Sequence, residues 1–153
     1  MSDFTIFERV WHRPDEHLFM SERHGIMAAV DTFPRLALQS VVAPRYGTPG
    51  TPAHFNLLPR PLKRKLFEVA DAVAEKILHN CDPNQRTTTH IEGNGVKDHA
   101  HIVVYASEPK QGADLYTGEI LGQLAVQHTL EVIRFSLEES ADLEARLDEI
   151  AQV

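Results

Sequence analysis

Two histidines separated by a single residue, His99 and His101, are the side chains whose types and spacing most favour chemistry in this sequence. Alternate residues of a β-strand point to the same face, so a strand through these positions holds both imidazoles side by side. Ala100 and Ile102 then point to the opposite face, into an apolar core. An imidazole is partly neutral near pH 7, which suits it to nucleophilic attack, and it is also a good zinc ligand. The spacing therefore predicts a site on a strand and leaves both kinds of chemistry open.

A loop of small residues, Gly93-Asn94-Gly95, lies shortly before the pair. Small residues let backbone N–H groups approach and surround an anion. Lys97 adds a positive charge beside the loop. We therefore expect Asn94, Gly95 and Lys97 to bind phosphate, while the same loop is also typical of an ordinary turn with positive φ angles.

The composition limits the size of the protein and the partners it can have. With 153 residues, of which 42% are hydrophobic, the chain can bury one sizeable core. The formal net charge of −7 disfavours a surface for long nucleic acids, although an acidic protein can still hold a single phosphate. A lone cysteine, Cys81, excludes an intrachain disulfide and suits a reducing compartment. No run approaches the roughly 18 apolar residues of a membrane span, and the first residues lack the features of a signal peptide. We predict a cytoplasmic protein without a membrane partner.

Apolar and turn residues along the chain predict strands, one long loop and a helix. Apolar runs bounded by glycine, asparagine and proline are typical of strands. The proline-rich segment from Pro44 to Pro61 cannot sustain regular structure and is expected to be a surface loop that borders the site. An apolar stripe at spacings of three and four residues then predicts a long helix, with Pro61 in its first turn and Asn80 near its end. The expected strands are residues 17–20, 26–30, 36–43, 87–92 and 99–106, with pairing of the first two and antiparallel pairing of the last two.

The C-terminal part of the chain is predicted to be helical. Apolar positions between Ile120 and Ile133 mark one helix, and Ser136 with Glu139 has the spacing of a capping box at the start of a second. The many acidic residues of this second helix predict a solvated surface helix. We therefore divide the chain into a domain of residues 1–113 and a helical extension of residues 114–153 that packs on the same domain.

The order of these elements, together with the histidine pair, resembles the histidine triad (HIT) family of nucleotide hydrolases and transferases. The motif of that family is His-φ-His-φ-His-φ-φ, where φ is apolar, and residues 99–105 match it except that Val103 stands at the third histidine. A second match lies upstream, where residues 28–34 and 41–45 are similar to a strand pair in which an acidic or amide residue before a proline touches the ribose. The resemblance covers residues 19–106 and implies an α+β fold, with a HIT-like antiparallel sheet, one long helix and the helical C-terminal extension.

The resemblance also implies roles for individual residues. His101, as the second histidine, would be the nucleophile that attacks the α-phosphorus of a nucleotide and forms a nucleotidyl-histidine, and His99 would position the site and contact the substrate. Asp31 would bind the ribose. Gln39, where the family has another histidine, would donate a hydrogen bond to a phosphate oxygen or leaving group but cannot supply a proton. The expected protein is a homodimeric hydrolase or nucleotidyl transferase that acts without a cofactor on a nucleoside phosphoramidate or a mono- or dinucleoside polyphosphate.

Two alternatives stay open. Val103 can neither donate nor accept a proton, so the loss of two of the family's histidines is also compatible with a nucleotide-binding protein that is catalytically impaired. Alternatively, His90 on the neighbouring strand could join His99 and His101 in holding a divalent metal for metal-dependent hydrolysis. Activity against a nucleotide substrate distinguishes the nucleotidyl-histidine enzyme from the impaired binding protein. Sensitivity to chelators distinguishes the metal-dependent hydrolase from both.

Overall fold

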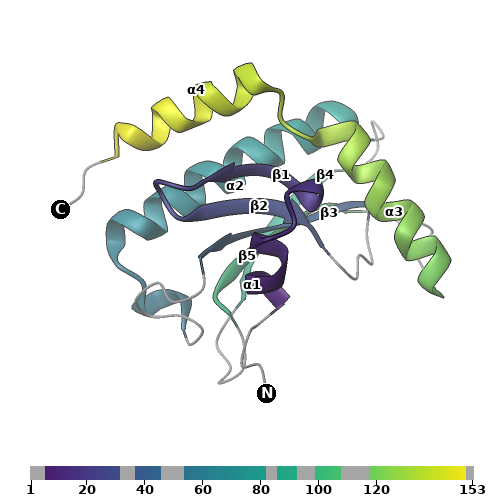
Figure 1. The fold of residues 1–153 in the computed structure, drawn as a ribbon, viewed down its shortest axis with the longest axis horizontal. Helices are drawn as coiled ribbons and strands as arrows, with labels where there is room; N and C mark the ends of the chain where they lie inside the picture. Colours follow the sequence, from purple (N-terminus) through teal and green to yellow (C-terminus); the bar gives the residue numbers. More distant parts are fainter. Residues whose placement is uncertain are drawn as a thin grey trace.

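A five-stranded antiparallel sheet is the centre of the structure (Figure 1). The structure is a computed structural model that describes residues 6–31, 37–45, 54–81, 86–92, 99–107 and 118–150. The strand order is β1-β2-β3-β5-β4, which places the last strand of the chain beside the third. The strands are β1 (His17–Ser21), β2 (Ile26–Val30), β3 (Ala37–Pro44), β4 (Arg86–Glu92) and β5 (His101–Ser107).

The pairing of the strands follows the sequence prediction. β1 and β2 form a hairpin around a turn in which Gly25 has a φ angle of 65°, a conformation that glycine adopts without strain. β4 and β5 pair with Glu92 opposite His101, as the prediction of two antiparallel strands requires. β3 pairs with both β2 and β5 and ends at Pro44. The predicted strand ends agree with the structure to within two residues, and the largest difference is that β5 begins at His101 rather than His99.

Four α-helices and two short 3-10 helices complete the described structure. The long helix α2 (Arg60–Asn80) confirms the prediction, because a proline lies in its first turn and its apolar stripe is buried. The short N-terminal helix α1 (Ile6–Trp11) was not predicted. None of the described helices is long and apolar enough to cross a membrane. The remaining elements are α3 (Gly118–Ile133), α4 (Leu137–Asp148) and the 3-10 helices Pro14–Glu16 and Phe55–Leu57.

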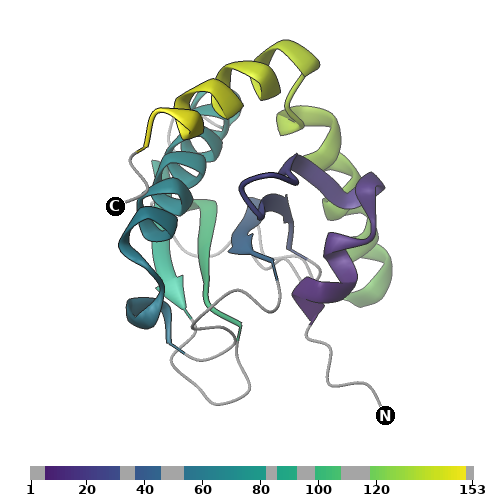
Figure 2. The ribbon, with the colours of Figure 1, turned by 60° about the vertical axis from the view of Figure 1, so that its left-hand side comes forward.

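Different helices cover the two faces of the sheet. Even-numbered apolar residues of β2, β3 and β5 pack in one core cluster together with residues of α2, α3 and α4. Odd-numbered residues of the same strands pack in a second cluster with Val10 and Trp11 of α1. Figure 2 shows α1 and α2 on different sides of the strands. We call the second surface of the sheet the α1 face, and its apolar strand residues are Met20, Met27, Ala29, Val41, Ala43, Val103 and Tyr105.

Helix α4 packs on the rest of the molecule. Its predicted capping box is confirmed: the Glu139 N–H donates to Ser136 Oγ over 3.1 Å, and the Ser136 N–H donates to the Glu139 carboxylate over 2.8 Å. Most of its acidic residues are exposed, but Leu143 and Leu147 are fully buried in the main core. Leucines four residues apart therefore give this otherwise exposed acidic helix one buried side, by which it packs on the main core.

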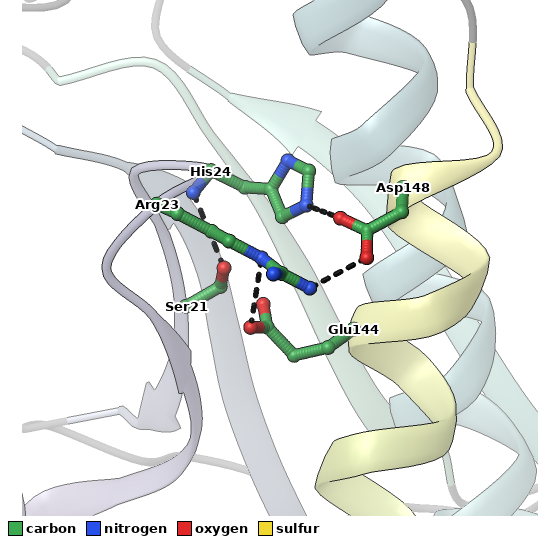
Figure 3. A network of polar contacts seen from close by, with 5 residues as sticks. All are labelled: Ser21, Arg23, His24, Glu144 and Asp148. Atoms are coloured by element: carbon green, nitrogen blue, oxygen red, sulfur yellow. Dashed lines mark hydrogen bonds and ion pairs between the residues drawn. The ribbon is translucent and has the colours of Figure 1, made fainter.

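A polar network joins α4 to the turn between β1 and β2 (Figure 3). The Arg23 guanidinium donates to one Asp148 carboxylate oxygen over 2.6 Å and lies 3.3 Å from the Glu144 carboxylate. The His24 ring nitrogen Nε2 lies 2.8 Å from the other oxygen of Asp148. The backbone N–H of His24 donates to Ser21 Oγ over 3.2 Å, which stabilises the turn that carries both side chains. The network connects the C-terminal helix to a hairpin near the other end of the chain.

Candidate functional site

His101 opens β5 on the α1 face of the sheet. It is two residues before Val103, and alternate residues of a strand share a face, so both positions point toward the side that α1 covers. The His101 side chain is 8% exposed. Val103, where the HIT motif has its third histidine, is 4% exposed and packs among the apolar residues of that face. The structure therefore gives position 103 a packing role, and His101 is the imidazole that β5 places at this end of the α1 face.

A backbone carbonyl fixes the tautomer of His101. Its ring nitrogen Nδ1 lies 2.6 Å from the carbonyl oxygen of His99, and both residues are buried. A carbonyl oxygen can only accept a hydrogen bond, so Nδ1 carries the proton and donates it. In the neutral ring, Nε2 then holds the lone pair. This is the tautomer that a nucleophilic histidine needs.

His99 is buried, and its ring donates a hydrogen bond through the other nitrogen, Nε2. Its Nε2 lies 2.7 Å from the carbonyl oxygen of Pro44, so Nε2 carries the proton and donates to that carbonyl. Burial lowers the pKa of the His99 imidazole and the nearby His101 lowers it further, while the Pro44 carbonyl and the charge of Glu8 act in the opposite direction. His99 is 1% exposed and neutral at pH 7. The geometry favours the positioning part of the role expected for His99.

Asp31 and Gln39 are brought together by β2 and β3. The Gln39 side-chain amide donates to an Asp31 carboxylate oxygen over 2.7 Å, and the Asp31 backbone N–H donates to the Gln39 carbonyl over 3.1 Å. The pairing of β3 with β5 is irregular between residues 37 and 40, where Leu38 has a φ angle of 57°. A left-handed residue other than glycine at such an irregularity redirects the side chains beside it. Both side chains are half-buried.

The two predicted groups of site residues lie toward opposite ends of β3. His99 contacts Pro44 at one end of that strand, whereas Gln39 belongs to the other end. Val41 is paired with Val103 between them. A ligand that reached both groups would therefore extend along β3 and β5, as an elongated molecule with a sugar and phosphates would do.

The predicted phosphate loop lies between β4 and β5 in the sequence. Asn94, Gly95 and Lys97 lie outside the residues that the structure describes, so their roles stay predictions.

The alternative of a metal site finds no support in the described residues. His90 lies opposite Val103 in β4 and therefore points to the α1 face, but its ring packs edge-on against Tyr105 with the ring centroids 5.6 Å apart. The described part of the chain contains no group of three or more histidine, cysteine, aspartate or glutamate side chains that could hold a metal ion.

Residues that the sequence analysis did not connect to the site lie next to the pair. Arg45 follows Pro44, and its guanidinium carbon lies 5.2 Å from the centre of the Trp11 ring in α1. Glu8, one turn earlier in α1, is close enough to influence the charge of His99. The sequence signal for α1 was weak, since a helix of only six residues shows no repeated apolar spacing.

Comparison with solved structures identifies the fold. A zinc-bound histidine triad family protein from Mycobacterium smegmatis superposes with a TM-score of 0.62 at 12% identity, over 92% of this chain and 96% of that one. A hypothetical histidine triad nucleotide-binding protein from Sulfolobus tokodaii gives 0.60 at 15% identity, over 97% and 100%. A HIT-like protein involved in cell-cycle regulation from Bartonella henselae gives 0.58 at 11%, over 86% and 98%. No family model matches the sequence, and no curated protein is significantly similar to it. The fold is therefore HIT-like, as the sequence resemblance implied.

Proposed function

We propose that this protein binds a nucleotide and cleaves it through a covalent intermediate on His101. The observation that carries the proposal is the 2.6 Å hydrogen bond from His101 Nδ1–H to the His99 carbonyl, because it leaves the lone pair on Nε2. The HIT-like fold and the nucleotide-binding description of the Sulfolobus protein support the choice of substrate class. The substrate would be a nucleoside phosphoramidate or a mono- or dinucleoside polyphosphate.

The reaction would proceed in two displacements at phosphorus. The Nε2 lone pair of His101 attacks the α-phosphorus, a phosphorus–nitrogen bond to the ring forms, and the bond to the leaving group breaks with its electron pair. Water then attacks the same phosphorus, the phosphorus–nitrogen bond breaks, and the nucleoside monophosphate is released. Backbone N–H groups near Asn94 and Gly95, with Lys97, would stabilise the charge on the phosphoryl oxygens.

The missing acid at position 103 restricts the leaving group. Val103 cannot protonate an amine as it departs, and no proton can come from Gln39. Leaving groups that are stable as anions, such as a phosphate or a nucleotide, need no such proton. We therefore favour a polyphosphate over a phosphoramidate as the better substrate.

The buried Val103 also favours a second candidate function, a nucleotide-binding protein without turnover. Incubation with diadenosine tetraphosphate and adenosine 5′-phosphoramidate, followed by product chromatography, separates the two. The enzyme should release adenosine monophosphate, and mass spectrometry after rapid acid-free denaturation should find the nucleotidyl group on the peptide that contains His101. His101→Ala should abolish both signals. Saturable binding measured by calorimetry, without any product, would support the binding protein. The absence of both binding and cleavage would overturn both functions.

A homodimer remains our proposal for the assembly. Among the described strands, β4 has one neighbour in the sheet, so its other edge can pair with a second chain. A groove of about 510 Å³ between β4 and α2 carries the exposed apolar side chains of Phe67 and Ile91. We also keep the cytoplasm as the predicted compartment, with Cys81 as a free thiol.

A further inference from the structure

We propose that Arg45 and Trp11 are positioning residues for the nucleophile, because together they fix the peptide group whose carbonyl orients the histidine pair. The inference rests on the proposed role of His101 and extends it to α1, an element outside the histidine motif. The contacts form a continuous series in space, from the Trp11 ring through Arg45, Pro44 and His99 to the ring of His101.

The first contact of this series joins α1 to the end of β3. The Arg45 guanidinium stacks over the Trp11 ring at 5.2 Å, a distance typical of a cation–π contact. Trp11 is itself buried among the apolar residues of the α1 face. The preceding residue, Val10, accepts a hydrogen bond of 2.7 Å from the buried His17 ring in β1, which ties the end of α1 to the sheet. The aromatic platform under Arg45 is therefore rigid.

The second step passes through a single peptide plane. The carbonyl of Pro44 and the N–H of Arg45 belong to one planar peptide group. The Arg45 N–H donates to the carbonyl of Gly25 over 2.8 Å, and the Pro44 carbonyl accepts from His99 Nε2–H over 2.7 Å. A rotation of this plane moves both ends at once. The side chain of Arg45 on Trp11 resists that rotation from outside the sheet.

The third step reaches the reacting atom. With its ring held at Pro44, His99 presents its own backbone carbonyl to His101 Nδ1–H over 2.6 Å. Displacement of that carbonyl would let the His101 ring turn or exchange tautomers, and Nε2 would then carry the proton in part of the molecules. A displacement of about 1 Å at a catalytic group can cost on the order of 100-fold in rate.

The test uses Arg45, which is exposed and belongs to neither core cluster. Two-bond ¹⁵N–¹H spectra of the histidine rings, recorded at about pH 8, report the tautomer of His101 without any substrate. Arg45→Ala should convert the single Nδ1–H tautomer of His101 into a mixture, and should lower kcat for diadenosine tetraphosphate by roughly tenfold with KM within about twofold. Arg45→Lys keeps a cation over the ring and should retain the tautomer and most of the rate.

Two further variants separate positioning from general destabilisation. Trp11→Leu removes the platform and should reproduce the effect of Arg45→Ala if the variant folds, and Trp11→Phe should have a smaller effect. Lys76→Ala removes a similar cation–aromatic contact, with Phe135 at 5.3 Å, from the other face of the sheet and should change neither readout.

Each result decides the proposal. An unchanged His101 tautomer in Arg45→Ala would overturn it. A raised KM with unchanged kcat would overturn it as well, because Arg45 would then contact the substrate instead. If the wild-type protein cleaves no nucleotide, the proposed function fails, and the ring spectra alone still show whether Arg45 positions His101.

Discussion

The two histidines of the pair donate through different ring nitrogens, and this difference sets what each can do. His99 donates Nε2–H to Pro44 inside the protein, whereas His101 donates Nδ1–H to the backbone of His99. One such hydrogen bond contributes about 0.5–1.5 kcal/mol, which favours one tautomer by up to roughly tenfold. Two backbone carbonyls therefore select opposite tautomers for two identical side chains, and only His101 offers a lone pair on Nε2.

The burial of His99 predicts a dependence of stability on pH. Its pKa lies below the usual 6.5, so on acidification the unfolded chain takes up a proton that the folded chain does not. This contribution to the free energy of unfolding is fully present above about pH 6.5 and is lost as the pH falls toward the folded-state pKa. His99→Gln keeps a donor for Pro44 but cannot titrate, so the decrease in urea midpoint between about pH 7.5 and pH 5 should be smaller. His79→Gln, an exposed histidine, is the control, and equal slopes for His99→Gln and wild type would contradict the prediction.

Restoring a histidine at position 103 should change the choice of leaving group. Val103→His places an imidazole on the same face as His101, where it can protonate a departing group. Cleavage of phosphoramidates with basic amines should accelerate most, and substrates with phosphate or aryloxide leaving groups should change less. The variant should also lose about 1–3 kcal/mol of stability, since position 103 lies in an apolar cluster. A rate change that is uniform across a series of leaving groups would exclude a proton-donor role.

The Asp31 carboxylate should matter more for ribonucleotides than for their 2′-deoxy analogues. A carboxylate can accept hydrogen bonds from both ribose hydroxyls, so Asp31→Ala should weaken ribonucleotide binding by about 1–3 kcal/mol and the deoxy analogue by less. Because Asp31 also accepts from Gln39, the control is Gln39→Ala, which removes that bond and keeps the carboxylate. Calorimetry with both ligands measures the losses. Equal losses for the two sugars in Asp31→Ala would show that Asp31 acts on the structure instead.

At the level of secondary-structure elements, local patterns predicted most of the fold and missed what depends on distant contacts. The apolar stripe of α2 and the capping box of α4 are visible in the sequence because their residues lie within a few turns of one another. The irregularity at Leu38 has no such signal, since no glycine marks its φ angle of 57°. The alternation of apolar residues also predicted that β5 begins at His99, but the strand begins at His101. The His99 ring instead donates to the Pro44 carbonyl, 55 residues earlier, a contact that no local pattern predicts. The contact of α1 with the site is likewise tertiary.

The two kinds of contact that hold α4 should contribute very differently to stability. Leu143 is 0% exposed and Leu137, in the first turn of the same helix, is 92% exposed. Leu143→Ala removes buried methyl groups and should cost about 2–5 kcal/mol, while Leu137→Ala, its matched control, should cost little. The exposed pair of Arg23 with Asp148 should show a coupling of only about 0.2–1 kcal/mol in a double-mutant cycle. Chemical denaturation measures all of these, and a larger value for the ion pair than for Leu143 would reverse this ranking.

On the scale of the whole molecule, the sheet separates two kinds of surface. α2, α3 and α4 bury the main core on one side, and the histidine pair shares the other side with α1. The outer edge of β4 belongs to neither of these two surfaces. β4 is the last strand of the sheet and lies next to β5, the strand that carries His101. A second chain that pairs with this edge would therefore approach the site from the side without closing the α1 face.

This arrangement predicts that the proposed dimer and the candidate site can be disturbed separately. Phe67 and Ile91 are 47% and 45% exposed in the single chain, so charges at these positions should cost the folded monomer little. In an apolar interface the same charges would be desolvated without partners, which strongly disfavours association. Phe67→Glu with Ile91→Glu, two like charges in the same groove, should therefore shift the mass measured by light scattering from dimer to monomer, while Leu137→Glu, at an exposed leucine elsewhere, should not. The His101 tautomer in ring ¹⁵N spectra should stay as in the wild type, because its acceptor belongs to the same chain. A wild-type protein that is monomeric at micromolar concentration, or a double variant that stays dimeric, would exclude this edge as the interface.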